Sequence, residues 1–368
     1  MKIAWPLVTL VVVAGAIASW IAAYYLLRNT VADQFSAMLL ARAADCTSSQ
    51  ADALEQKSQS DPGNFAPRIE LLDYYSLKSV KGTLTATDFS NRRAHILWTI
   101  EHEPESKFAG DFAASFAGDG SSSDPDGARK AADLWLQQVD AHSSNAHVLY
   151  SAGEFFYWSG NWQQSESLLE RARSIKPRSF EISFALAEDY WHDANAASAP
   201  GQRRDLAARA LDASEQAFDL ANGDRQRSLV LPDATQAAYQ AGDLARAEAW
   251  ANQMVGEGSG HQDDTNYSDE IHYGNIVLGL LALKKGDLKG AGDHLVQAAA
   301  TAGNPHLDTF GPNMMLAREL LKKGDRKPVL EYLGSCGNFW KLGGKRLKRW
   351  RSEINAGAIP DFGANLHS

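Results

Sequence analysis

The fold is decided by residues 146–179, AHVLYSAGEFFYWSGNWQQSESLLERARSIKPRS. Two small residues in this stretch, Gly153 and Ala172, allow two helices to pack closely against each other. Gly160 lies between the halves, where glycine permits a tight turn. Pro177 ends the second half, because proline cannot continue a helix. The stretch therefore predicts two antiparallel helices joined by a short turn.

The same residue types recur at a period of about 34 residues, which is typical of a helical repeat. Related units begin near Phe180, Ser228, His272 and Phe310. Three of them keep a Gly-Asp turn between the helices: Gly242-Asp243, Gly286-Asp287 and Gly324-Asp325. The unit at Phe180 carries an insertion near 199–201 instead. We therefore expect stacked helix pairs that bury a core between neighbours.

This pattern resembles the tetratricopeptide repeat family. Residues 146–179 match nearly every signature position of that repeat, with Ser165 in place of the usual alanine. The resemblance extends from residue 61 to about residue 340, and it implies an all-α solenoid of about seven helix pairs. Within it, 64–104 and 112–145 are expected to be degenerate pairs. The C-terminal part is similar to that of uncharacterised bacterial membrane proteins that contain this repeat, which implies no biochemical activity.

The composition limits the classes of function. The formal net charge is −9, which argues against a general nucleic-acid binder, because such proteins need a basic excess to meet the phosphates. The two cysteines, Cys46 and Cys336, are too few for a disulfide framework or a four-cysteine zinc site. A single bridge between them stays open, although two unrelated thiols are the simpler interpretation.

An apolar segment lies near the N-terminus. Residues 3–27 contain no charged side chain over 25 positions. A helix of that length exceeds the roughly 30 Å core of a bilayer, and the apolar region of a cleaved signal peptide is only about 7–15 residues. We therefore expect a retained single-pass anchor, with the repeats outside the cytoplasm. Gly15 and Ser19 could let two anchors approach, so a homodimer stays open.

The repeat pattern also predicts a partner-binding surface. The first helix of each unit lines the concave face in proteins of this family, and its candidate contact residues here are Tyr150, Glu154, Tyr157, Trp158, Phe184, Glu188, Trp191, Tyr239 and Tyr273. Aromatic rings with interspersed carboxylates suit a peptide that carries apolar side chains and some Lys or Arg. The alternative, that these rings pack between helices, is equally compatible with the sequence.

A basic run near the C-terminus has two interpretations. Residues 341–351 carry six cations in eleven positions, with Leu347 and Trp350 between them. The run could contact anionic lipid or an acidic partner. The favoured interpretation is the solvated face of a capping helix, since a terminal repeat needs a polar outer surface.

Signals for catalysis are absent from the sequence: it has no H-E-x-x-H, G-x-S-x-G or phosphate-binding loop motif. We therefore expect no enzyme, no cofactor and no metal site. The expected organisation is a transmembrane signal anchor at 1–28, a helical or polar spacer at 29–60, degenerate pairs at 61–145, the main array at 146–340, and a basic capping helix and tail at 341–368.

The leading hypothesis is a membrane-anchored scaffold that mediates protein-protein interaction at the bacterial cell envelope, with a protein or peptide partner and no nucleic acid. One alternative is a permanent accessory or assembly subunit of an integral-membrane complex. Another is an enzyme or ligand-binding protein with its site in residues 57–144, which a strand-containing fold there, or a deep pocket with perturbed carboxylates, would favour.

Overall fold

The computed structural model describes residues 46–80, 82–116, 124–258, 267–304, 307, 311–340 and 343–366. These residues form fifteen α-helices and two short 3-10 helices, and they contain no strand. The prediction of an all-α fold is therefore confirmed for the part of the chain that the structure describes. The chain divides into two compact units at Tyr190, within helix α10 (Phe180–Ala196), and each unit is described by itself.

The predicted membrane anchor, residues 3–27, lies outside the described residues. Among the helices of the described part, none is both long and apolar enough to cross a membrane.

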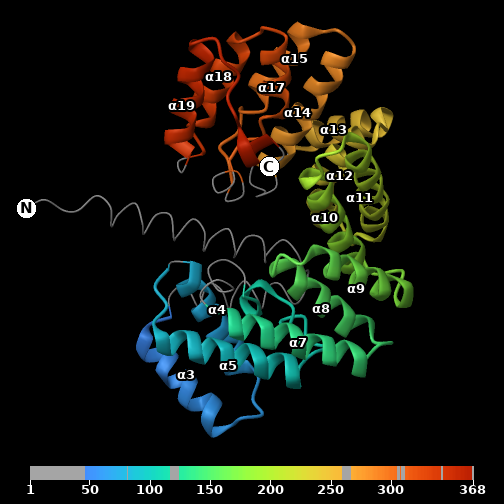
Figure 1. Ribbon diagram of the computed structural model, residues 1–368. Coiled ribbons are helices and arrows are strands. Elements are labelled where there is room, and N and C mark those ends of the chain that lie inside the picture. The colour runs from blue at the N-terminus through green and yellow to red at the C-terminus, as the bar shows by residue number, and fades with distance from the viewer. Residues whose placement is uncertain are drawn as a thin grey trace, which may run out of the picture. The chain divides into compact units, whose positions relative to one another are not determined.

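The first unit contains seven elements before α10, which Figure 1 colours from blue to green. They are α3 (Ser48–Ser60), α4 (Ala66–Val80), α5 (Ala86–His102), η1 (Phe112–Ala114), α7 (Pro125–Ala141), α8 (Ala146–Trp158) and α9 (Trp162–Ile175). Each α-helix packs on the next one along the chain, from α3 to α9. This succession is what stacked helix pairs produce.

Helix α3 falls where the sequence predicts a spacer, yet it belongs to the folded unit. Thr47 and Gln50 form a capping box at its start, in which each side chain accepts the backbone N–H of the other residue. Its Ala51 packs into a small core with Leu71 and Tyr74 of α4. Local capping and one buried alanine thus fix a helix that has no strong apolar stripe.

The region 112–145, predicted as a degenerate helix pair, contains only one full helix among its described residues. The Asp111 side chain accepts the backbone N–H of Ala113, and this cap starts the short 3-10 turn η1 in place of a first helix. The second predicted helix is present as α7, with Trp135 fully buried.

Helices α8 and α9 form the hairpin that the sequence predicts for residues 146–179. A Cβ atom added to Gly153 would lie only 2.8 Å from Leu169 Cγ, so glycine is what allows the two helices to approach this closely. Gly160 adopts a φ of +77°, a left-handed conformation that makes the turn. Asn161 then caps α9 by accepting the backbone N–H of Gln164.

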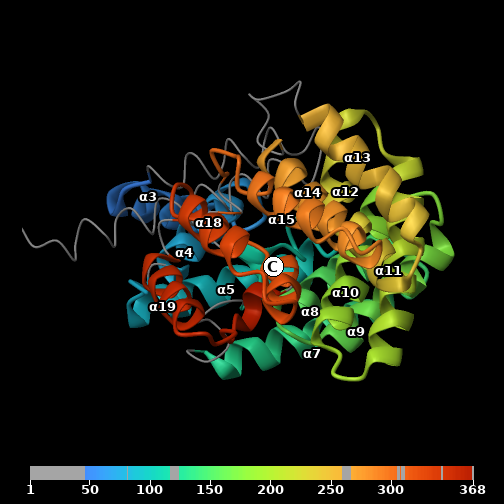
Figure 2. The same ribbon diagram turned by 90° about the horizontal axis from the view of Figure 1, so that it is seen from above.

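The second unit repeats this arrangement. After α10 it contains α11 (Pro200–Leu220), α12 (Asp224–Ala241), α13 (Leu244–Gly258), α14 (Tyr267–Lys284), α15 (Leu288–Gln297), α17 (Met315–Lys322), α18 (Lys327–Cys336), α19 (Gly344–Asn355) and η3 (Gly363–Leu366). The predicted glycine turns have positive φ at Gly242, Gly286 and Gly324. The predicted insertion at 199–201 is instead the first turn of α11, with Pro200 as its first residue. Helices α14, α15 and α18 lie side by side in both views (Figures 1 and 2).

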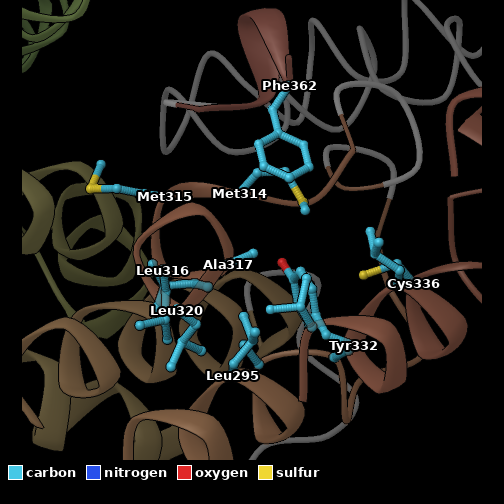
Figure 3. Packing of buried hydrophobic residues seen from close by; sticks show 14 of the residues in the cluster. Leu295, Met314, Met315, Leu316, Ala317, Leu320, Tyr332, Cys336 and Phe362 are labelled. Atoms are coloured by element: carbon cyan, nitrogen blue, oxygen red, sulfur yellow. The ribbon is translucent and has the colours of Figure 1, made fainter. Parts of the chain in front are cut away.

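The core of the second unit is closed by the C-terminal elements. Side chains of α15, α17 and α18 converge there, as Leu295, Leu320 and Tyr332 show in Figure 3. Helix α19 buries Leu347 and Trp350 against them. Its apolar side is therefore already covered within the unit.

Two buried asparagines, Asn313 before α17 and Asn365 in η3, make hydrogen bonds at the two ends of this C-terminal part. The side-chain amide of Asn313 donates to Gln236 Oε1 at 3.0 Å, and the backbone carbonyl of Asn313 accepts from Tyr332 Oη at 2.8 Å. The backbone carbonyl of Asn365 accepts the N–H of Met314 at 2.7 Å, and its side-chain amide donates to the Pro312 carbonyl. These bonds pair backbone groups of the buried extended segment 312–314. Leaving those groups without hydrogen bonds would cost free energy.

Candidate partner-binding site on helix α8

Four of the predicted contact residues share one face of α8. Tyr150, Glu154, Tyr157 and Trp158 follow the i, i+4, i+7, i+8 spacing that places side chains on one side of a helix. The three rings are half-buried, and Glu154 is buried with 7% of its surface exposed. The helix begins at the cap residue Asn145, whose side chain accepts the N–H of His147 at 3.0 Å. The face is thus built on a rigid, well-capped element.

The rings of this face form a cluster. Tyr157 and Trp158 meet edge to face, with ring centroids 5.1 Å apart. The ring of Phe112, from η1, packs edge to face on the same Trp158 at 5.3 Å. Such pairs favour a fixed geometry because the positive edge of one ring meets the negative face of the other. Phe112 is not among the predicted contact residues, because the sequence pattern places it in a helix. The preceding Gly110-Asp111 is the signal of the turn that the structure contains.

The chain around η1 lies directly against α8. We call residues 106–116 the η1 segment. Ser151 Oγ of α8 donates to the backbone carbonyl of Ser106 at 3.3 Å. A Cβ atom added to Gly110 would lie 2.0 Å from the Ser151 backbone oxygen, so the two backbones touch at this point. The η1 segment, which consists of turns and a short 3-10 helix, thus packs directly on this helix.

Two carboxyl groups, those of Asp111 and Glu154, interact at this site. Burial raises the pKa of Asp111 well above its ordinary value, and the nearby carboxylate of Glu154 raises it further. The backbone N–H of Ala113, which Asp111 accepts, acts in the opposite direction. A cationic group that approached this pair would be attracted, because it would stabilise the ionised form of both carboxyls.

Replacing Gly110 with alanine is expected to loosen the η1 segment, at a cost of about 1–3 kcal/mol. The new Cβ would clash with a backbone carbonyl inside a helix, which cannot rotate away as a side chain would. Hydrogen exchange measured by mass spectrometry should accelerate in peptides that cover residues 106–116. Gly63→Ala is the matched control, because no atom lies within 4 Å of its added Cβ. Equal exchange in the two variants would contradict the close contact.

The other predicted contact residues have different surroundings. Phe184, Trp191 and Tyr273 are buried, and Tyr273, with 2% of its surface exposed, belongs to the core of the second unit. Their burial agrees with the alternative that these rings pack between helices. Glu188 and Tyr239 are half-buried, and the Lys284 ammonium lies 5.3 Å from the centre of the Tyr239 ring. The α8 face is therefore the best-supported part of the predicted surface.

A buried polar network in the first unit is relevant to the alternative of a site in residues 57–144. An Arg68 nitrogen lies 3.0 Å from His95 Nδ1, and His95 Nε2 lies 3.0 Å from Glu55 Oε1. Because arginine can only donate, Nδ1 accepts and the proton sits on Nε2, which donates to Glu55. Tyr75 Oη also donates to Glu55 Oε1, at 2.7 Å. Both ring nitrogens of His95 are used in joining α3, α4 and α5, so this network is structural.

The described residues show no group of three or more His, Cys, Asp or Glu side chains arranged to hold a metal ion. Cys46 and Cys336 are both free thiols.

No protein-family model matches the chain, and no curated protein does. Among solved structures, the human IFIT1 dimer with PPP-AAAA is similar at a TM-score of 0.44 and 15% identity, over 84% of this chain and 68% of that one. The human IFIT1 dimer with m7Gppp-AAAA is similar at a TM-score of 0.44 and 16% identity, over 85% and 70% of the two chains.

Proposed function

We propose that this chain is a non-enzymatic scaffold that binds another protein through the aromatic face of α8. The observation that carries the proposal is that the half-buried rings of Tyr150, Tyr157 and Trp158 share one face of one helix, where Tyr157 and Trp158 pack edge to face. Large aromatic side chains supply much contact area at a small loss of conformational entropy, and they dominate the energetics of protein interfaces.

The chemistry of the face indicates what the partner presents. Its rings favour apolar side chains, and their π-faces also attract cations. Glu154 lies on the same face of α8 as the rings, and its carboxylate favours a Lys or Arg of the partner. We therefore propose a peptide segment that combines an apolar residue with a basic one, bound reversibly.

We further propose that residues 3–27 anchor the scaffold in the cell membrane, with the repeats outside the cytoplasm. The support is the uncharged length of that segment. An anchor would raise the local concentration of whatever the scaffold binds near the membrane.

The test is a cross-linked membrane pull-down with mass spectrometry, which compares the native chain with Tyr157→Ala/Trp158→Ala. Loss of two interface rings is expected to reduce capture of specific partners at least 10-fold, as hot-spot substitutions of about 2 kcal/mol do. Phe218→Ala/Trp250→Ala is the matched control, since these half-buried rings also form a pair, with centroids 6.0 Å apart. Helical melting curves must show that all three proteins fold.

Equal capture by the native chain and the α8 variant would overturn the proposal. Partners that stay bound through high salt and detergent would instead favour a permanent subunit of a membrane complex.

A further inference from the structure

The charge of this protein is unevenly distributed along its sequence. Residues 318–368 contain eleven Lys and Arg and only five Asp and Glu, a formal charge of +6. The residues before them carry a formal charge of −15. The cationic part coincides with the helices that end the second unit, α17, α18 and α19. This separation of charge gives the C-terminal helices a positive potential, which favours an anionic partner there.

The cations of α19 are fixed on its outer side by the way the helix packs. Leu347, Trp350 and Ile354 face the core and are buried. Lys345 and Lys348 are exposed, and the helical period of 100° per residue places them on the side opposite the buried residues. Arg349 is exposed on the same side. We call Lys345, Lys348 and Arg349 the basic face.

Few acidic groups neutralise the basic face. Arg349 Nε lies 3.6 Å from Glu353, and both side chains are solvent-exposed, so this pair is weak. Within the described residues, Lys345 and Lys348 have no carboxylate within 4.0 Å. A further cation stands at the end of the helix, where Arg326 donates to the carbonyl of Gly357 at 2.7 Å. The net field of this surface therefore stays positive.

The side chains around the basic face indicate the class of anionic partner. Single-stranded nucleic acid needs exposed rings for stacking, but Trp340 and Trp350 are both buried in the core. A protein interface is usually centred on a large aromatic anchor, and the exposed large apolar side chain of this described region is the lone Ile359. A row of cations without such anchors suits a layer of charged lipid headgroups, which requires no shaped pocket.

We propose that the basic face of α19 contacts anionic headgroups of the membrane in which the chain is anchored. This inference rests on the membrane anchor of the proposed function, because the anchor is what brings the second unit near a lipid surface. The apolar side of α19 is occupied by the core, so the contact is electrostatic and involves no insertion of the helix. It should therefore weaken steeply with salt.

The test uses the full chain with Cys46→Ser and Ser352→Cys, labelled with a fluorophore at the exposed position 352. Cys336 is fully buried and does not compete for the label. The protein is placed in nanodiscs of neutral phosphatidylcholine, or of phosphatidylcholine with anionic phosphatidylglycerol, each containing a headgroup quencher. Quenching is expected only in the anionic discs, and it should be lost at about 0.5 M NaCl, where screening is strong.

A charge-reversal variant identifies the residues responsible. Lys345→Glu/Lys348→Glu/Arg349→Glu is expected to reduce the contact about 100-fold, given the usual contribution of each cation near an anionic surface. Arg171→Glu/Lys176→Glu/Arg178→Glu changes the net charge equally at three exposed positions of the first unit and should leave the quenching intact.

Equal quenching in neutral and anionic discs, or equal loss in both variants, would overturn the lipid contact while leaving the scaffold untouched. A chain that does not enter the discs would overturn the anchor, and the lipid contact with it.

Discussion

Replacing Asp124 with alanine is expected to lower the free energy of unfolding by about 3 kcal/mol, because it removes a helix cap and an ion pair whose arginine is half-buried. Asp124 is only 4% exposed. Its carboxylate caps α7 by accepting the N–H of Gly127 at 2.9 Å, and it accepts Arg93 Nε at 2.7 Å and a second nitrogen of the same guanidinium. One side chain thus holds the start of α7 and an arginine of α5.

A second arginine makes the loss larger. Arg92 is 2% exposed, and burial lowers its pKa to about 10, while the charge of Asp124 acts in the opposite direction. Without Asp124, this buried cation would keep its bond to the Ser115 carbonyl and its place over the Phe116 ring, but it would lose the carboxylate charge that offsets its burial. The uncompensated charge would then add to the lost cap.

Urea titrations of Asp124→Ala and Asp124→Asn separate the two contributions. Asparagine keeps the capping oxygen but removes the charge, so the difference between the variants measures the cap, at about 1 kcal/mol. The difference between the native chain and Asp124→Asn measures the ionic contribution. A native-like Asp124→Ala protein would show that these contacts do not stabilise α7.

Asp73→Asn is expected to stabilise the protein at pH 7–8, by about 2–4 kcal/mol. Asp73 lies on α4 with 8% of its surface exposed, and burial raises its pKa to about 8, with the neighbouring Glu70 carboxylate adding to the effect. No described residue donates a hydrogen bond to its carboxyl. The folded state therefore holds a proton that the unfolded chain releases near pH 4.

The sign of the pH dependence follows from this difference. Between about pH 4 and pH 8 the folded state binds more protons at Asp73 than the unfolded state, so its contribution to stability falls as the pH rises. The amide of Asp73→Asn does not titrate, so the stability difference between the proteins should be largest near pH 8 and smallest near pH 4. Melting curves across this range measure it.

Asp133→Asn on α7 is the matched control, because that side chain is exposed and should give a small, nearly pH-independent change. The stability difference between the native chain and Asp73→Asn should change between pH 5 and pH 8. An equal difference at the two pH values would contradict the raised pKa of Asp73.

The sequence predicts the hairpins well because their determinants are local. Gly153, Gly160 and Pro177 each act through contacts within one helix pair, and their roles are visible in a single stretch. Helix α3 and the η1 turn were predicted less well. Their caps are local, but the contacts that hold these elements in the folded unit come from partners distant in sequence. Glu55 of α3 meets Tyr75 and His95 of other helices, which no periodicity reveals.

The candidate site was predicted in part for a similar reason. Helical spacing places Tyr150, Glu154, Tyr157 and Trp158 on one face whatever surrounds them. Spacing alone does not predict which rings neighbouring elements cover, and Tyr273 is covered by the core of the second unit. The contribution of Phe112 likewise depends on a turn that brings η1 onto α8.

The glycine turns place each helix against its neighbours in the chain, and this arrangement affects the order in which the protein folds and opens. Each helix contacts mainly the next helices along the chain, so most native contacts join residues close in sequence. Such a low contact order favours rapid folding, since little loop entropy is lost before contacts form. It also lets neighbouring pairs open separately, so that protection from hydrogen exchange should be graded along a unit and greatest at its interior pairs.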